Sequence, residues 1–138
     1  MLILDSNTIS YYFRGDPHVV PRLQALSPAD IGVPAIEEYE LRYGLLRLQP
    51  EAAAPRLAAL SALLRPIQIL PFDSECATYA ARIRADLEAV GTPIGPHDLL
   101  IAATALRHQA TLVTRNLREF ARVQNLQCLS WHEDDHKN

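Results

Sequence analysis

The sequence predicts an α/β fold in which helices flank a mainly parallel sheet of about five short strands. Short apolar runs alternate with longer segments of helical periodicity along the 138 residues. Such alternation requires crossover connections, which are right-handed and place helices on both faces of the sheet. The length suits one domain. We expect that domain to span residues 1–131 and to be followed by a polar tail at residues 132–138.

Five apolar runs are the predicted strands, because each is short and is bounded by turn residues or by the start of a helical pattern. They cover residues 2–4, 31–33, 67–70, 111–114 and 126–129, the last as an edge strand. The first run has the composition of a strand that is buried on both faces. We expect the first and fourth strands to be neighbours at a switch point, where a parallel sheet opens a ligand crevice.

The segments between the runs are predicted helices, because apolar residues recur in them at helical spacing and Gly, Pro, Asp or Ser residues stand near their ends. They cover about residues 7–14, 17–26, 35–48, 51–64, 73–90, 97–108 and 116–122. The Ala- and Leu-rich helix at 51–64 is apolar on most sides. That surface suggests packing on two sides and a contact with a partner or a second copy.

Charge, hydropathy and cysteine content narrow the functional classes. The formal net charge is −3, whereas a protein that binds nucleic acid through bulk electrostatics is basic. Any nucleic acid must therefore be held by a local patch or through a bound metal. The apolar runs are too short for a transmembrane span and the N-terminus lacks a signal-peptide pattern, so we expect a cytoplasmic protein. Cys76 and Cys128 stand far apart and are expected to be free thiols.

Five acidic or amide side chains are predicted to gather at the carboxyl edge of the sheet. Asp5 ends the first strand, and Asn116 and Glu119 follow the fourth strand. Glu40 lies early in the helix after the second strand, and Asp98 lies in the first turn of the helix that follows a Gly/Pro-rich loop. Ligand crevices of parallel sheets form at this edge, so these residues are the candidate site.

Clustered carboxylates repel one another, and each raises the pKa of its neighbours. A divalent cation removes this conflict, and Mg²⁺ and Mn²⁺ prefer oxygen ligands. A water on such a cation can attack phosphorus while the metal stabilises the leaving oxygen. The cluster therefore suggests a metal site that cleaves a phosphodiester, in which the cation also supplies the charge that holds the polyanion.

Each of these residues also has a purely structural interpretation. Asp5 and Asn116 could cap the helices that follow them, and Asp98 could interact favourably with a helix dipole. Glu40 could be a solvated helix charge, and Glu119 could form a surface ion pair with the arginine that precedes it. The sequence alone leaves these alternatives open.

Histidines and small hydroxyl residues leave further alternatives. His97 could be a general base or simply a loop residue. His132 and His136 have i, i+4 spacing that could hold a soft metal weakly, but a frayed, solvated tail is the simpler interpretation. Ser6 and Thr114 could orient carboxylates or cap helices.

Four short motifs follow one another along the chain. They are Asp5-Ser6-Asn7 after an apolar strand, Glu40-Leu41-Arg42-Tyr43-Gly44, Gly95-Pro96-His97-Asp98 before Ile101-Ala102-Ala103, and Val113-Thr114-Arg115-Asn116 with Glu119-Phe120, with Trp131 near the end. In this order and spacing they resemble the PIN-domain ribonucleases, and specifically the VapC-type toxins of bacterial toxin–antitoxin pairs. The resemblance covers essentially the whole chain.

The resemblance implies a PIN-like three-layer fold and an endoribonuclease that depends on Mg²⁺, with Mn²⁺ as a substitute. Asp5, Glu40 and Asp98 would be the catalytic metal-binding acids, with Glu119 and Asn116 sharing the fourth position. It also implies a homodimer, a VapB-type antitoxin, and contact with operator DNA only through the antitoxin complex. Relatives with a Gly-Thr-Pro-x-Gly-Pro loop, here residues 91–96, cut initiator tRNA in the anticodon stem-loop, so tRNA is the expected substrate.

Three other functions remain open on the sequence. A haloacid-dehalogenase-like phosphotransfer enzyme would use Asp5 as a nucleophile, but it needs an Asp where Asn7 stands. It also needs a Lys near the phosphate, and the single Lys of this chain is Lys137 in the tail. A metal-dependent, structure-specific DNA nuclease of related fold is a second alternative. The third is a binding module in which the acids serve only as helix caps.

Overall fold

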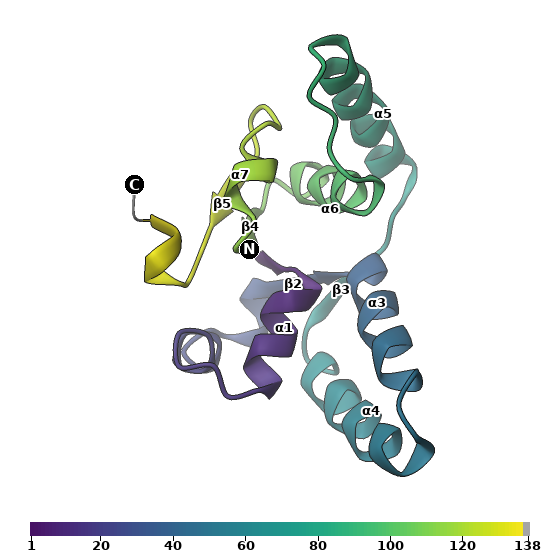
Figure 1. Ribbon diagram of the computed structural model, residues 1–138, viewed down its shortest axis with the longest axis vertical. Helices are drawn as coiled ribbons and strands as arrows, with labels where there is room; N and C mark the ends of the chain where they lie inside the picture. The colour runs from purple at the N-terminus through teal and green to yellow at the C-terminus, as the bar shows by residue number, and fades with distance from the viewer. Residues whose placement is uncertain (137–138) are drawn as a thin grey trace.

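The sheet has five strands in the computed structural model, which describes residues 1–136 (Figure 1). The strands are β1 (Leu2–Leu4), β2 (Ile31–Pro34), β3 (Gln68–Leu70), β4 (Thr111–Val113) and β5 (Gln127–Leu129). They lie in the order β3-β2-β1-β4-β5, and every adjacent pair is parallel. β1 is central and pairs directly with β4. The predicted parallel sheet and the predicted neighbours are therefore confirmed.

Seven α-helices connect these strands within residues 1–136. They are α1 (Ser6–Phe13), α2 (Val20–Gln24), α3 (Ala35–Leu46), α4 (Pro50–Leu64), α5 (Ser74–Ala89), α6 (Pro96–Arg107) and α7 (Leu117–Phe120). Two short 3-10 helices, η1 (Pro28–Asp30) and η2 (Glu133–His136), complete the described elements. Most of the predicted helices are confirmed to within two or three residues at each end.

Two helices are shorter than predicted. The helix expected at 17–26 begins only at Val20, because the carboxylate of Asp16 accepts hydrogen bonds from the backbone N–H groups of His18 and Val19 and holds a turn there. The helix expected at 116–122 is limited to Leu117–Phe120. It ends because the N–H of Arg122 bonds the carbonyl of Glu119, three residues back, as in a tighter turn.

The sheet separates two hydrophobic cores, as the alternation of strand side chains requires. Ile3 and Leu112 face the core formed with α5, α6 and α7. Leu4 and Val113 point the other way, into the core formed with α1, α2 and α4. Figure 1 shows this three-layer arrangement, with α5, α6 and α7 above the strands and α1, α3 and α4 below them. The predicted three-layer α/β fold is confirmed.

α4 leaves part of its apolar surface uncovered. It buries a stripe formed by Ala53, Leu60 and Leu64, while most of its remaining alanines are exposed. The chain therefore covers one side of this helix and leaves the other side exposed, so the packing on a second side stays a prediction. No helix within residues 1–136 is long and apolar enough to cross a membrane. Both cysteines are free, as predicted.

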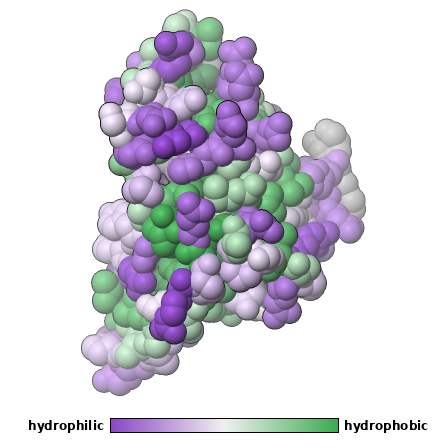
Figure 2. Space-filling model, turned by 180° about the vertical axis from the view of Figure 1, so that it is seen from behind, coloured by the Kyte–Doolittle hydropathy of each residue, from purple (hydrophilic) through white to green (hydrophobic). Residues whose placement is uncertain are grey.

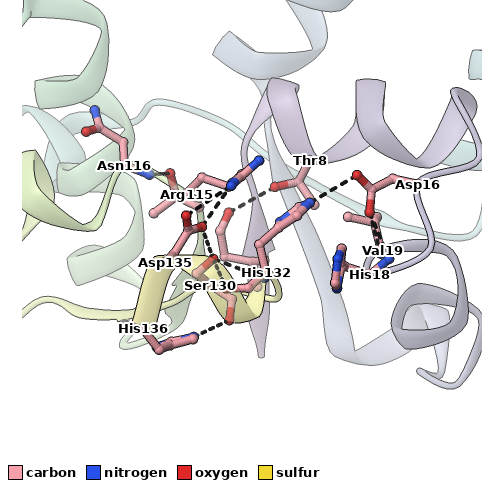
Figure 3. A network of polar contacts seen from close by, with 12 residues as sticks. Thr8, Asp16, His18, Val19, Arg115, Asn116, Ser130, His132, Asp135 and His136 are labelled. Atoms are coloured by element: carbon pink, nitrogen blue, oxygen red, sulfur yellow. Dashed lines mark hydrogen bonds and ion pairs between the residues drawn. The ribbon is translucent and has the colours of Figure 1, made fainter. Parts of the chain in front are cut away.

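The segment after β5 packs on the body of the domain (Figure 3). His132 is only 6% exposed, and its Nε2 lies 3.0 Å from Oδ2 of Asp16. Arg115 donates to both carboxylate oxygens of Asp135 at 3.0 and 3.1 Å. The expectation of a solvated tail is therefore wrong for His132, because partners from distant segments enclose it. Residues 137–138, including the single Lys, lie outside the described part of the chain.

Candidate active site

Asp5 lies at the carboxyl end of the central strand and is buried, with 8% of its surface exposed. Its Oδ1 accepts hydrogen bonds from the backbone N–H and the hydroxyl of Thr8 at 2.8 and 2.7 Å. Asp5 is therefore the N-cap of α1. Both bonds use Oδ1, so the cap leaves Oδ2 available to a ligand. Capping and metal binding are compatible here, because they use different oxygens.

Glu119 is fixed from two directions at the same edge of the sheet. Its Oε1 accepts from the backbone N–H of Gly95 at 2.9 Å, and its Oε2 accepts from the side-chain amide of Asn116 at 2.8 Å. The Gly95 N–H is the main reason why the pKa of Glu119 is lowered. Asn116 makes no capping bond with its side chain, so the capping interpretation is wrong for this residue. Its amide instead holds Glu119 in place.

Asp98 lies in the first turn of α6 and shares its surroundings with Glu119. Burial, followed by the hydrogen bond and the negative charge of Glu119, raises the pKa of Asp98 to about 6. The charge of Glu37 also raises the pKa of Asp98. Burial and neighbouring carboxylates both disfavour the charged form of a carboxyl group. The two carboxyl groups compete for a proton that a divalent ion would replace.

Glu37 was named in none of the predicted site roles, and the structure places it deep in the site. It lies in the first turn of α3 and is 1% exposed. One carboxylate oxygen accepts from the backbone N–H of Ser6, and the other lies 2.5 Å from Nε2 of His97. Burial raises the pKa of Glu37, and its contacts with Ser6 and His97 oppose that effect. The signal that could have found it is its nearness to the end of β2, since it is closer to the sheet edge than Glu40.

Glu40 lies one turn farther along α3, at the mouth of the site. Its side chain is 40% exposed, and its Oε1 lies 3.9 Å from Nδ1 of His97, which is too far for a hydrogen bond. Glu40 also lines a groove of about 560 Å³ together with Ser6, Phe13 and Arg14. The structure thus places Glu40 at the rim and Glu37 at the floor.

A continuous path of contacts links the ends of three strands. The backbone N–H of Ser6, which follows β1, donates a hydrogen bond to Glu37 of α3, and Glu37 also bonds the imidazole of His97. Asp98 is the next residue after His97 and contacts Glu119. Ser6, Glu37 and Glu119 follow β1, β2 and β4, which are adjacent in the sheet, whereas His97 and Asp98 lie at the start of α6, which precedes β4. The structure therefore places Asp98 and Asn116 each in contact with Glu119, connects Asp5 to this path only as the chain neighbour of Ser6, and leaves Glu40 at the edge.

The donor set fits a hard divalent cation. Carboxylate oxygens are the ligands that Mg²⁺ and Mn²⁺ prefer, and the carboxyl groups of Asp98 and Glu119 lie side by side at this point. Within residues 1–136, no three acidic, histidine or cysteine side chains are already placed as a complete ligand group. A cation would therefore have to draw the carboxylates of Asp5, Asp98 and Glu119 toward a common centre.

Residues 2–126 match the PIN domain family. The chain belongs to the PIN-domain family. The tRNA(fMet)-specific endonuclease VapC of Salmonella typhimurium is 32% identical over 130 residues, which cover 94% of this chain and 96% of the relative. Toxin FitB of Neisseria gonorrhoeae is 34% identical over 139 residues, which cover 96% of this chain and 100% of the relative.

Solved structures agree with this assignment of the PIN domain. DNA-bound VapBC from Salmonella typhimurium has a TM-score of 0.86 at 30% identity, and covers 95% of this chain and 98% of the matched chain. FitAcB from Neisseria gonorrhoeae has a TM-score of 0.88 at 32% identity, with the same shares covered. The predicted family, fold and nuclease class are confirmed. The PIN domain is a VapC-type nuclease, and the phosphotransfer and binding-module alternatives are set aside.

Proposed function

We propose that this VapC-type PIN domain is an endoribonuclease toxin that cuts RNA phosphodiesters with Mg²⁺, for which Mn²⁺ can substitute. The observation that carries the proposal is the gathering of acids at the carboxyl edge of the sheet, where the Gly95 N–H and the Asn116 amide hold the two oxygens of Glu119 beside Asp98. Asp5, Asp98 and Glu119 would hold the metal, and Glu40 at the mouth would complete the set. A bound divalent cation supplies a Lewis acid to the scissile phosphate.

The other residues of the site orient these acids. Asn116 and the Gly95 N–H fix the two oxygens of Glu119, and Thr8 fixes one oxygen of Asp5. Fixed carboxylates lose less freedom when a cation binds. The acids also repel a polyanion, so the strand that is cut must be held through the cation and through uncharged or basic groups around the mouth.

The proposed substrate is tRNA, with the anticodon stem-loop of initiator tRNA as the first candidate. Support comes from the Salmonella typhimurium relative, which is named as a tRNA(fMet)-specific endonuclease. It also comes from the Gly91–Pro96 loop motif, whose Gly95 N–H bonds Glu119 at 2.9 Å. We place the activity in the cytoplasm, where tRNA is available.

The proposed partners are a VapB-type antitoxin and a second copy of the chain. The groove of about 560 Å³ starts at Ser6 and Glu40 and runs between α1, α3 and α4. Tyr39, Tyr43 and Leu46 of α3 are 61%, 53% and 65% exposed, as expected for a surface that meets another protein. Figure 2 shows hydrophobic surface gathered across the middle of the rear face, below the hydrophilic end that α5 forms.

An antitoxin segment with a basic side chain would suit the acid cluster, because a positive charge relieves the repulsion between Asp98 and Glu119. Contact with operator DNA would occur only through the antitoxin complex, as the DNA-bound complex of the Salmonella typhimurium relative suggests. The net charge of −3 favours this arrangement over direct DNA binding by the chain.

Controlled expression tests the proposed function. Wild type and Asp98→Asn are expressed from a tight inducible promoter while growth and total RNA are followed, with Asp86→Asn as the control because Asp86 is an exposed acid on α5. We expect growth arrest and a discrete RNA fragment for wild type and Asp86→Asn only. Arrest by Asp98→Asn as well would contradict the proposal. Incubating the purified protein with RNA and with DNA would separate a ribonuclease from a structure-specific DNA nuclease.

A further inference from the structure

Glu37 and His97 form a pair that metal binding by the acids does not explain. A buried carboxylate is costly unless it is hydrogen-bonded or paired. Glu37 is 1% exposed, yet it lies beside a cluster that is already rich in negative charge. Both of its oxygens are occupied, one by the Ser6 N–H and one by the imidazole of His97. This carboxylate is therefore used to hold other groups.

His97 is held on one edge and open on the other. Nε2 of its imidazole lies 2.5 Å from the buried carboxylate of Glu37, and its side chain is 37% exposed. Nδ1 lies 3.9 Å from Oε1 of Glu40 at the rim of the site, which is too far for a hydrogen bond. A carboxylate that bonds one ring nitrogen fixes the orientation of the ring and leaves the other nitrogen for a ligand.

The position of His97 places this free edge beside the reacting group. His97 precedes Asp98 in the first turn of α6, and the two side chains are close enough for the charge of His97 to act on the Asp98 carboxyl group. We therefore expect a phosphodiester held at Asp98 to come within reach of the imidazole. The surrounding carboxylates repel phosphate, whereas an imidazole nitrogen can form a hydrogen bond with a sugar or phosphate oxygen. Glu37 and Glu119 beside Asp98 are acids, and the neutral amide of Asn116 is bonded to Glu119, whereas the His97 imidazole is not an acid and is partly exposed.

We propose that His97 contacts an oxygen of the RNA backbone through the Nδ1 edge, and that Glu37 is a positioning residue that holds His97 for this contact. The inference rests on the proposed function, because it requires an RNA strand at the acid cluster. The oxygen is either a ribose 2′-hydroxyl or a non-bridging phosphate oxygen. A ribose 2′-hydroxyl can donate a hydrogen bond to an imidazole nitrogen or accept one from a ring N–H, whereas a non-bridging phosphate oxygen can only accept one from a ring N–H.

Removing the ring nitrogens of His97 tests the contact with RNA. His97→Phe keeps a ring but removes both nitrogens, and we expect kcat/KM on a synthetic initiator-tRNA anticodon stem-loop to fall about 10- to 100-fold. The matched control is His108→Phe at the other end of α6, because Nε2 of His108 is buried without a hydrogen-bond partner among the described residues. We expect the control to cut at the wild-type rate. His97→Phe should lower the melting temperature, because it leaves one oxygen of buried Glu37 without its partner, so the rates are compared at a temperature where every variant is folded.

A double-mutant cycle tests whether Glu37 acts through His97. Glu37→Gln keeps the shape of the side chain, and we expect about a 10-fold loss of kcat/KM, consistent with the cost of a displaced group near the reacting atoms. In a His97→Phe background the same change should cost nothing further. Glu38→Gln is the control, since Glu38 is paired with Arg42. Additive losses would overturn the positioning role.

Modified substrates identify the oxygen. Single 2′-deoxy or phosphorothioate substitutions are introduced on each side of the cleavage site. At one position we expect the substitution to lower the cleavage rate of the wild type but not that of His97→Phe. If this substitution is 2′-deoxy, the contact is to the 2′-hydroxyl, and if it is a phosphorothioate, the contact is to the phosphate oxygen. Equal sensitivity of both proteins at every position would overturn the contact. This comparison does not depend on Glu37→Gln, so it remains decisive if that variant fails to fold.

Metal binding separates the pair from the metal ligands. Calorimetric titration of Mn²⁺ into the protein should give the same affinity for wild type, His97→Phe and Glu37→Gln, and a much weaker one for Asp98→Asn. A strong loss of Mn²⁺ affinity in Glu37→Gln would make Glu37 a metal ligand and overturn the inference. If wild type cuts no RNA while it binds Mn²⁺ normally, the proposed function fails, and this inference fails with it. If wild type cuts and His97→Phe cuts equally well, only the inference fails.

Discussion

Two polar clusters of this PIN domain use the same kinds of side chain in opposite ways. In the C-terminal cluster, Arg115 binds both oxygens of Asp135, and with Ser130 it lowers the pKa of Asp135 to about 2. At the carboxyl edge of the sheet, burial and Glu119 raise the pKa of Asp98 to about 6. The first cluster pairs its carboxylate with an arginine, whereas in the second the carboxyl group of Asp98 lies beside another acid. We infer that the first stabilises the fold and that the second awaits a ligand.

The largest expected effect is that of Asp98→Asn. Removing this carboxylate should abolish RNA cleavage, a loss greater than the roughly 10–100-fold typical of residues that only support a metal ligand. Metal-free stability should stay the same or rise, because one of two repelling groups is gone. Cleavage assays and urea unfolding in the presence of a chelator check both parts. A less stable Asp98→Asn would mean that the acid cluster is also structural, and the contrast between the clusters would fail.

Asp16→Ala tests the other cluster. The change removes the acceptor for the backbone N–H groups of His18 and Val19 and the partner of buried His132. We expect a loss of about 1–3 kcal/mol in the free energy of unfolding, the usual cost of an unsatisfied buried polar group. Cleavage below the melting temperature should persist. Urea unfolding measures the loss in the free energy of unfolding, with Asp30→Ala as the control because Asp30 is exposed. If the folded variant no longer cleaves RNA, the two clusters are coupled.

Asn116→Ala should have a smaller effect on activity than Asp98→Asn. The substitution removes the amide that bonds Oε2 of Glu119 at 2.8 Å but leaves the bond from Gly95 to Oε1. We expect cleavage to fall about 10-fold, the lower end of the range for residues that orient a metal ligand. The metal concentration for half-maximal rate should rise as well. If the loss equals that of Asp98→Asn, Asn116 would itself bind the metal.

The smallest expected effect is a pH dependence of stability. Because the pKa of Asp98 is raised in the folded state to about 6, folded protein binds more protons than unfolded protein between about pH 4 and about pH 6. The stabilisation from this group is present below the unfolded pKa and is lost as the pH rises through the folded pKa. The free energy of unfolding of the wild type should therefore fall with rising pH relative to that of Asp98→Asn.

Urea unfolding of both proteins without metal, at about pH 4.5 and about pH 7, measures this difference. Added Mg²⁺ should restore the stability of the wild type at the higher pH, because a ligand that binds the folded state stabilises that state. A difference that does not change with pH would contradict the close contact between Asp98 and Glu119.

The carboxyl edge of the sheet was more predictable from the sequence than the C-terminal cluster. The five strands and the positions of Asp5 and Asp98 at element ends were predictable, because apolar runs and Gly/Pro breaks are local signals. The burial of His132 was not, because Asp16 and Tyr11, more than a hundred residues earlier in the chain, enclose its ring. Composition alone suggested a polar tail there.

Glu37 and Glu40 show what the tertiary structure alone decides. Three residues apart on α3, they face nearly the same direction and are separated by about 4.5 Å along the helix axis. No local pattern says which one is deeper. The start of α1 and the start of α6 settle it, because Ser6 and His97 reach Glu37 and leave Glu40 at the rim. The sequence determined the fold and the supply of acids, since these depend on local periodicity. Which acid lies at the floor depends on how closely distant segments approach one another, and only the folded chain fixes that.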